Sequence, residues 1–253
     1  MADVMFKGTV TFSARIKGNG LKFSLIEFNP KEQGVDKVEI EGPNGDEIRT
    51  TVHLSSVASH EDGRTLATRL TTAALNRICF NHSIAIENAR ITGDQFSPLN
   101  HQPGVLEVAV SNNLFLSSTL SAVVGIPAAH VKTELGQPSM PGEHNYGFFR
   151  SALQSISPVE KFMHLYNILL MICNDNQADV DSFIVSEDPA VPQTKAPPRK
   201  PGARGKMETV YTRLRNEFAH RRAGMNLDNT KSEMANRLGG LIGLTKRAIE
   251  LNP

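Results

Sequence analysis

The amino-acid sequence predicts an α+β protein with two domains, a mixed, β-rich N-terminal domain over residues 1–140 and a helical domain over residues 141–253. Apolar and polar residues alternate near the N-terminus, as in half-buried strands. In the second half apolar residues recur every third or fourth position, as in amphipathic helices. A passage rich in proline and glycine separates the two patterns and is typical of a domain boundary. A length of 253 residues with 40% hydrophobic residues is sufficient for two packed cores.

Four strands are expected to open the N-terminal domain as a small antiparallel meander. Gly18-Asn19-Gly20 is a turn signal after the first strand, and Gly42-Pro43-Asn44-Gly45 is a stronger one between the last two. We therefore expect the second strand to pair with the first. The four expected strands are Phe6–Ile16, Lys22–Phe28, Lys37–Glu41 and Glu47–Leu54.

A helix is expected after this meander, because apolar residues then recur at helical spacing. Asp62 can cap its N-terminus. Ser83–Ile91 and Val105–Val110 are expected to return to the sheet, and the apolar stretch Leu114–Val124 fits either type of element. The apolar stripe of the helix consists of Leu66, Leu70, Ala73, Ala74 and Ile78.

Four helices are expected in the second domain. Ser157 at the cap, Pro158 at the first helical position and Glu160 in the first turn mark the start of the second of them. Prolines and basic residues dominate residues 186–206, which predicts an exposed, mobile loop. The expected helices are Phe148–Ser155, Pro158–Cys173, Lys206–His220 and Asn229–Leu251.

Several classes of function are disfavoured by what the sequence lacks. Cys79 and Cys173 lie in apolar helical patterns, so we expect reduced core thiols. The histidines have no metal-ligand spacing, and no glycine-rich phosphate loop is present, so neither a metal nor a cofactor is expected. The N-terminus does not resemble a signal peptide, and the longest apolar run, Ile168–Cys173, is too short to span a bilayer. A cytoplasmic protein without membrane attachment is the resulting prediction.

Basic residues concentrate between Lys195 and Arg222, although the net charge of the whole chain is only +1. Nine lysines and arginines oppose only Glu208 and Glu217 there, so the local charge is +7. Such a cluster predicts attraction to phosphate, although a solvated linker before a charged helix end has the same composition. The candidate RNA-binding residues in this cluster are Lys206, Arg213, Arg221 and Arg222.

The candidate catalytic residues, Arg215, Asn216 and His220, lie within six positions at the end of an expected helix. Arginine can bind a phosphodiester with two hydrogen bonds, histidine can transfer a proton near neutral pH, and asparagine can orient either of them. Five residues turn a helix by about 500°, so Arg215 and His220 lie about 140° apart around the axis. A long arginine side chain, a frayed last turn or a second copy of the chain could bring them together.

The spacing Arg215, Asn216, three residues, His220 near a helix end resembles the signature of HEPN domains (higher eukaryotes and prokaryotes nucleotide-binding). Residues 162–170 are similar to the first long helix of that family, and residues 208–221 are similar to methylamine-utilization proteins of the MauJ type. The resemblance covers about Tyr146–Pro253 and implies a HEPN-like helical bundle in the second domain.

The resemblance also implies a function. Many HEPN domains are metal-independent endoribonucleases in which the ribose 2′-hydroxyl attacks the adjacent phosphate and leaves a 2′,3′-cyclic phosphate. It implies RNA or a nucleotide as ligand, a homodimer in which a second histidine protonates the leaving 5′-oxygen, a toxin or defence context, and a regulatory protein partner.

Two alternatives remain open. Some HEPN domains are noncatalytic nucleotide-binding or protein-interaction modules. The motif can also be structural, with Arg215 paired to a carboxylate such as Asp175 or Glu160 and His220 capping carbonyl groups at the helix end.

Overall fold

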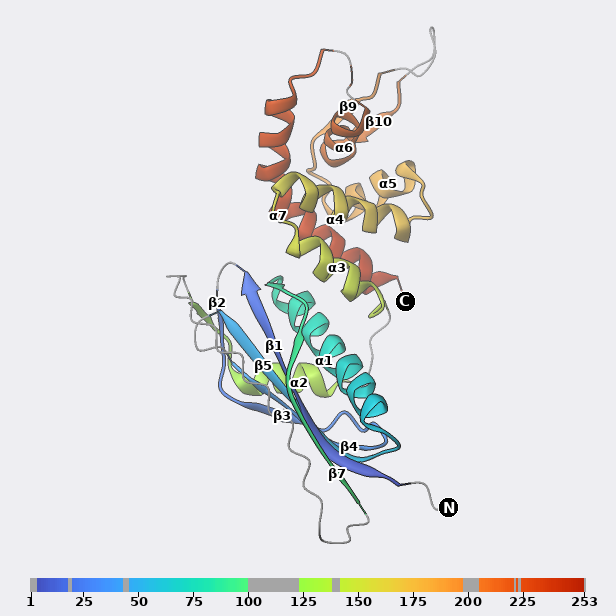
Figure 1. Cartoon of the computed structure of the whole chain (residues 1–253). Coiled ribbons are helices and arrows are strands. Elements are labelled where there is room, and N and C mark those ends of the chain that lie inside the picture. The colour runs from blue at the N-terminus through green and yellow to red at the C-terminus, as the bar shows by residue number, and fades with distance from the viewer. Residues whose placement is uncertain are drawn as a thin grey trace. The chain divides into compact units, whose positions relative to one another are not determined.

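The structure is a computed structural model that describes residues 4–17, 20–42, 46–99, 123–137, 142–197, 205–220, 222 and 224–252, with the backbone alone for residues 20–22 and 123–125. The chain folds into two compact units, Met1–Pro138 and Ser139–Pro253. An antiparallel sheet in the first unit is followed by the helices of the second (Figure 1). The predicted α+β class, with strands first and helices second, is therefore confirmed.

The sheet of the first unit is organised around its longest strand, β1 (Phe6–Lys17). Strand β1 pairs antiparallel with β5 (Glu47–Val57) on one side, and with β6 (Ala85–Ile86) and β7 (Arg90–Pro98) on the other. β4 (Val35–Glu41) and β3 (Ile26–Phe28) extend the sheet beyond β5. The outer pairings are thus antiparallel as well.

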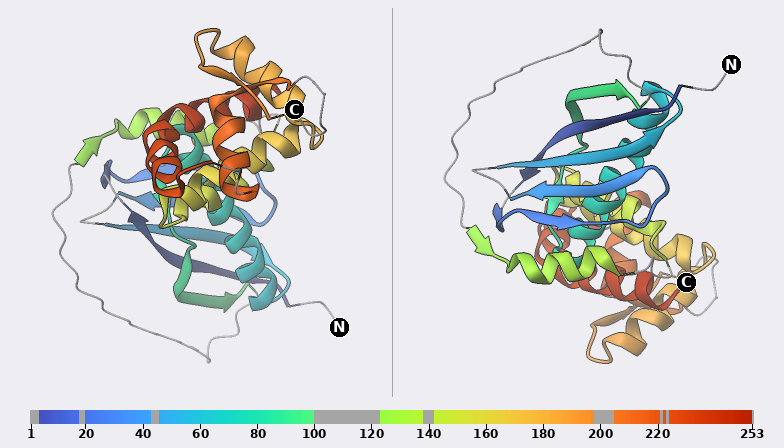
Figure 2. Two further views of the ribbon diagram at one scale, coloured as in Figure 1. Left: turned by 90° about the horizontal axis from the view of Figure 1, so that it is seen from above. Right: turned by 90° about the horizontal axis from the view of Figure 1, so that it is seen from below.

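Two helices pack on this sheet, α1 (His60–His82) and α2 (Ala128–Gly136) (Figure 2). They cover the apolar side of the strands, where alternate residues of β1 are buried, from Val10 to Ile16. This alternation is the pattern expected for a half-buried strand. Helix α1 contributes Ala67, Leu75 and Ile78 to the same core.

Two expectations for this unit are wrong. The strand at Ile26–Phe28 pairs with β4 and not with β1. The two long sides of β1 are instead occupied by β5 and β7, which pair with it over most of its length and satisfy its backbone hydrogen bonds. Helix α1 is capped by Ser59, whose Oγ accepts a hydrogen bond of 3.0 Å from the Asp62 backbone N–H, so Asp62 lies in the first turn. The strand expected at residues 105–110 lies outside the described residues.

The second unit contains five helices among its described residues. Helix α4 (Pro158–Ile172) packs against α3 (Asn145–Gln154) and α7 (Leu227–Leu251), and α6 (Val210–His220) also packs against α7. Helix α4 begins at the predicted proline, with Ser157 at its N-cap position. Its buried residues Phe162, Leu165, Tyr166 and Leu169 form the centre of this core.

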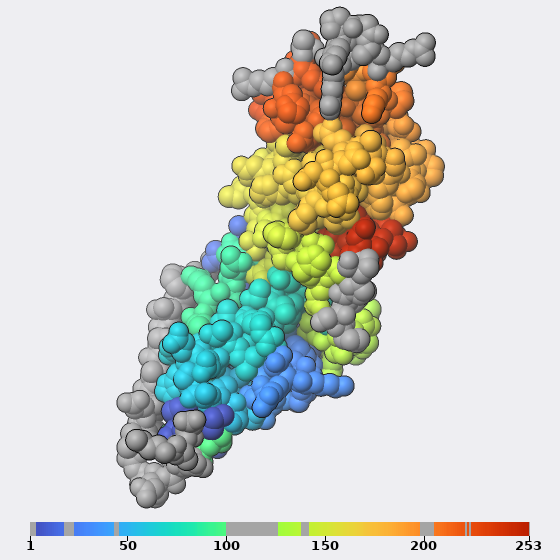
Figure 3. All heavy atoms as spheres, turned by 90° about the vertical axis from the view of Figure 1, so that its right-hand side faces the viewer, coloured from blue at the N-terminus to red at the C-terminus, as the bar shows by residue number. Residues whose placement is uncertain are grey.

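Helix α5 (Gln177–Glu187) was not expected from the sequence. Asn174 and Asp175, both with positive φ, end α4 and turn the chain, and Asn176 caps α5 by accepting from the Ala178 backbone N–H. In Figure 3 the side chains of α4 and α5, coloured yellow to light orange, form part of the outer surface of this unit.

The stretch at residues 186–206 is more ordered at its two ends than the expected loop. Its first residues complete α5, and β9 (Gln193–Lys195) pairs antiparallel with β10 (Met207–Thr209). Residues 198–204 lie outside the described residues. Among the residues that are described, no helix combines the length and apolar character needed to cross a membrane.

Truncation of a buried side chain should destabilise the second unit more than truncation of an exposed one. Leu169 is fully buried, so Leu169→Ala is expected to lower the free energy of unfolding by about 2–5 kcal/mol. Ile156 is 91% exposed, and Ile156→Ala should change that free energy by less than about 0.5 kcal/mol. Urea unfolding followed by helical circular dichroism measures both, and equal losses would contradict the described core.

Candidate functional site

Helix α6 is anchored at its N-terminus by the carboxylate of Asp181 from α5. One carboxylate oxygen, Oδ1, accepts from the Thr209 backbone N–H at 2.9 Å and from the hydroxyls of Thr209 and Thr212, each at 2.7 Å. A negative charge is favourable at this end of a helix, where the backbone N–H groups lack partners within the helix. Asp181 therefore joins α5 to β10 and to the first turn of α6.

A buried tyrosine extends this anchor into the core. The Tyr166 hydroxyl lies 2.7 Å from Thr212 Oγ1, and the Tyr166 side chain is fully buried. Burial raises the pKa of the Tyr166 phenol above its usual value. The phenol keeps its proton and donates a hydrogen bond to Thr212 Oγ1. The Thr212 hydroxyl in turn donates a hydrogen bond to Asp181 Oδ1.

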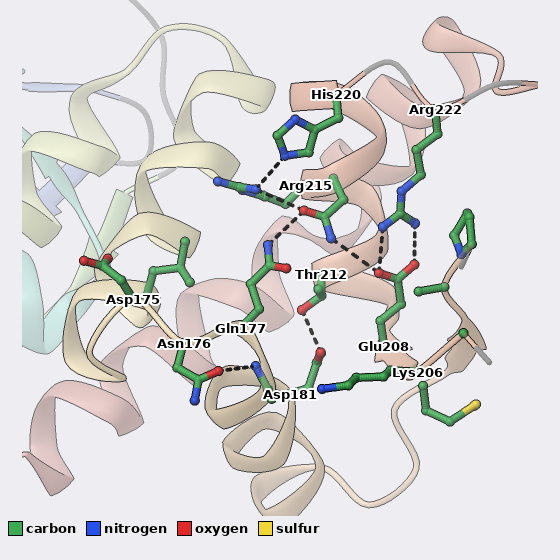
Figure 4. A pocket seen from close by; sticks show the side chains of 17 residues that line it. Asp175, Asn176, Gln177, Asp181, Lys206, Glu208, Thr212, Arg215, His220 and Arg222 are labelled. Carbon is green, nitrogen blue, oxygen red and sulfur yellow. Dashed lines mark hydrogen bonds and ion pairs between the residues drawn. The ribbon is translucent and has the colours of Figure 1, made fainter. Parts of the chain in front are cut away.

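Arg215 and His220 meet at the other end of α6. Arg215 Nη1 lies 3.3 Å from His220 Nε2, so the long arginine side chain closes the 140° separation within a single chain (Figure 4). Arginine only donates hydrogen bonds. A hydrogen bond from Arg215 to His220 therefore requires an imidazole whose Nε2 is the acceptor and whose single proton lies on Nδ1.

Asn216 is the hub of the hydrogen bonds that hold this pair. Its Oδ1 accepts from Arg215 Nη1 at 3.0 Å and from Gln177 Nε2 at 2.9 Å. Its Nδ2 donates to Glu208 Oε2 at 3.4 Å. Asn216 is only 6% exposed, so its amide has little access to water as a substitute partner.

Glu208 is a buried carboxylate that also binds Arg222. Arg222 Nη2 donates to Glu208 Oε2 at 2.9 Å, and Arg222 Nη1 donates to the second carboxylate oxygen. These hydrogen bonds raise the pKa of the Arg222 guanidinium. The Glu208 side chain is 5% exposed, and this bidentate pairing offsets the cost of burying its charge.

The hydrogen-bonded side chains around Asn216 border a cleft of about 1140 Å³, which is large enough for a nucleotide. They are Gln177, Glu208, Arg215, Asn216, His220 and Arg222. Figure 4 shows that they come from α5, β10, α6 and the residues that follow α6. Among the described residues, three cationic residues and three carboxylates border it, so this part of the lining is not strongly basic. The cationic residues are Lys206, Arg215 and Arg222, and the carboxylates are Asp175, Asp181 and Glu208.

Arg215 has an unused hydrogen-bonding edge. Its Nε is buried and has no hydrogen-bond partner among the described residues, and its guanidinium contacts Asn216 and His220 through Nη1. Leaving a buried donor unsatisfied costs about 1–3 kcal/mol. Nε and Nη2 together form the edge of a guanidinium that binds two oxygens of one anion. Neither Asp175 nor Glu160 pairs with Arg215 in the described part of the chain.

The four candidate RNA-binding residues lie in different environments. Lys206 is exposed at the cleft, whereas Arg222 lines the cleft but is held by Glu208. Arg213 does not line the cleft, and its guanidinium binds Glu217 at 2.9 Å and Glu233 at 2.6 Å. Arg221 lies outside the described residues.

Gln177 and Glu208 are parts of the site that the sequence analysis did not identify. Gln177 lies in a helix that was not expected, 39 positions from Asn216, and no local pattern connects the two. Glu208 had one usable signal, since it is an acidic residue in an otherwise basic segment.

Within the described residues, no group of three or more histidine, cysteine, aspartate or glutamate side chains is placed to hold a metal ion. Comparison of the chain with protein-family models, with curated proteins and with solved structures gives no match.

Removing the Asp181 anchor should destabilise the second unit. Asp181→Ala leaves the buried Thr209 and Thr212 donors without their acceptor, so we expect a loss of about 1–3 kcal/mol in the free energy of unfolding. Asp179→Ala, an exposed carboxylate in the first turn of the same helix, should cost at most about 1 kcal/mol. Urea unfolding of both variants measures the difference, and a larger loss for Asp179→Ala would contradict the anchor.

Proposed function

We propose that the cleft is the active site of a metal-independent endoribonuclease of HEPN type. The observation that supports this most is the contact between Arg215 Nη1 and His220 Nε2 beside the unused Nε edge of Arg215. That edge suits a phosphodiester, and the neighbouring imidazole nitrogen carries a lone pair that can accept a proton. A base and an anion-binding group therefore lie within reach of one phosphate and its adjacent ribose.

In the proposed reaction, His220 Nε2 exchanges its contact with Arg215 for the ribose 2′-hydroxyl and takes up its proton. The 2′-oxygen attacks the adjacent phosphorus, and the bond from phosphorus to the 5′-oxygen breaks. Arg215 stabilises the negative charge that grows on the phosphoryl oxygens. The leaving 5′-oxygen takes a proton from His220 of a second copy, whose imidazole starts in the protonated form and is left neutral. The products are a 2′,3′-cyclic phosphate and a 5′-hydroxyl.

His220 is suited to these exchanges by its position. It is exposed at the end of α6, so an RNA strand or a second copy of the chain can approach it. Lys206 is also exposed at the cleft and adds a cation for the RNA backbone. A homodimer, a regulatory protein partner and a toxin or defence context belong to the same proposal and rest on the resemblance to HEPN domains. A cytoplasmic location is also part of it and rests on the absence of a signal-peptide pattern in the sequence.

A noncatalytic nucleotide-binding or protein-interaction module is the second candidate, favoured by the charge balance of the described lining of the cleft. Among these residues, three carboxylates equal three cationic residues in number, so a long polyanion gains less there than at a uniformly basic surface. The Arg215 edge would then bind one phosphate group of a nucleotide without cleavage. Nucleotide binding that depends on Arg215, by a folded protein that leaves RNA intact, distinguishes this candidate.

Purified protein should cleave total RNA in excess EDTA. His220→Ala should lower the rate by about 10²–10⁴-fold because the base is lost. Arg215→Ala should lower it by about 10²–10³-fold because charge stabilisation is lost. Gel analysis of the fragments measures the rates. Direct labelling of the new 5′ ends by polynucleotide kinase shows a 5′-hydroxyl, and resistance of the new 3′ ends to phosphatase until acid opens the ring identifies the cyclic phosphate.

Two matched variants control for unspecific effects. His164→Ala removes an exposed histidine of α4 and Arg247→Ala an exposed arginine of α7, and neither residue lines the cleft. Both should cleave at the wild-type rate. Cleavage by His220→Ala at the wild-type rate would show that His220 is not the general base. Absence of cleavage by folded wild type would favour the binding module.

A further inference from the structure

The orientation of the Asn216 amide decides what Arg215 contacts. An asparagine amide presents an oxygen acceptor on one side and an NH₂ donor on the other, and the two sides can be exchanged by a flip. Gln177 Nε2 and Arg215 Nη1 are donors on one side, and the Glu208 carboxylate is an acceptor on the other. Arg215 can only donate and the Glu208 carboxylate can only accept, so only one of the two orientations gives both of them a complementary partner.

The flipped orientation is disfavoured on both sides. It would direct the NH₂ group at the cationic Arg215 and the amide oxygen at the Glu208 carboxylate. Neither group could move away easily, because Asn216 and Glu208 are 6% and 5% exposed. The buried charge of Glu208 thus holds the acceptor side of Asn216 toward Arg215.

Glu208 is itself held from two directions. Arg222 binds its carboxylate with both guanidinium nitrogens from beyond the end of α6. The next residue of β10, Thr209, is anchored by Asp181. The carboxylate therefore has a defined place relative to α6, which a flexible surface glutamate would not have.

We propose that Glu208 and Gln177 are positioning residues for the Arg215–His220 pair and act through the polarity of the Asn216 amide. Glu208 fixes which side of the amide faces Arg215, and Gln177 supplies the second donor to the same oxygen. Arg215 Nη1 is thereby held, its Nε edge is left for the phosphate, and His220 keeps its Nδ1–H tautomer. The consequence for RNA cleavage rests on the proposed function, whereas the effect on the His220 tautomer does not.

A reversal of polarity tests this proposal. Asn216→Asp places two carboxylates against each other, and Glu208→Gln removes the charge that orients the amide. In the double variant the glutamine NH₂ can donate to the aspartate, which still accepts from Arg215 and Gln177. We expect each single variant to lower kcat by up to about 100-fold, through misplacement of the reacting groups, with KM nearly unchanged. The double variant should recover at least tenfold over the poorer single variant.

The His220 tautomer gives a readout that is independent of activity. Long-range ¹⁵N–¹H correlation spectra, assigned with His220→Gln, should show the Nδ1–H form in wild type and in the double variant. Each single variant should show a mixture of tautomers. Gln177→Ala should show a smaller change in the same direction, because it removes one of the two donors to Asn216.

Glu233→Gln is the matched control. It also removes a carboxylate that binds an arginine, but this arginine, Arg213, does not line the cleft. Its His220 spectrum and its kcat should equal those of wild type. An unchanged tautomer in both folded single variants, or a double variant no better than the poorer single one, overturns the positioning role. If wild type cleaves no RNA while the tautomer changes as expected, the proposed function fails and the positioning role stands.

Discussion

The buried carboxylate of Glu208 needs a hydrogen-bond donor on each side, and the candidate site is assembled from the groups that supply these donors. Arg222 supplies two of them from beyond α6, and Asn216 supplies a third from within α6. Because the Asn216 amide is committed to Glu208 on one side, its oxygen faces Arg215 and Gln177 on the other. Loss of this one charge would remove one of the two charged groups that select the orientation of the amide.

In this arrangement one nitrogen of the Arg215 guanidinium is hydrogen-bonded and another has no partner. Nη1 contacts both Asn216 and His220, whereas the buried Nε has no partner among the described residues. A buried donor without a partner is uncommon in folded proteins. An anion with two oxygens would satisfy the Nε edge, and a phosphodiester is such an anion.

The sequence was informative where the determining interactions are local. The start of α4 at Pro158 and the end of α6 at His220 follow from capping preferences and apolar spacing, and both match the structure. The pairing of β1 with β5 depends on contacts distant in sequence. The turn signal next to β1 therefore led to the wrong prediction that the following strand pairs with it. For the same reason the motif indicated Arg215, Asn216 and His220, but Gln177 and Glu208 became visible only when α5 and β10 were placed beside α6.

A DNA oligonucleotide that contains a single ribonucleotide tests most sharply whether the ribose 2′-hydroxyl attacks the phosphate on its 3′ side in this cleft. We expect one cut in excess EDTA, on the 3′ side of the ribose, with a 2′,3′-cyclic phosphate on that fragment. The all-DNA oligonucleotide should stay intact. No cut in the mixed oligonucleotide by a protein that cleaves RNA elsewhere, or equal cutting of the all-DNA strand, would contradict this mechanism.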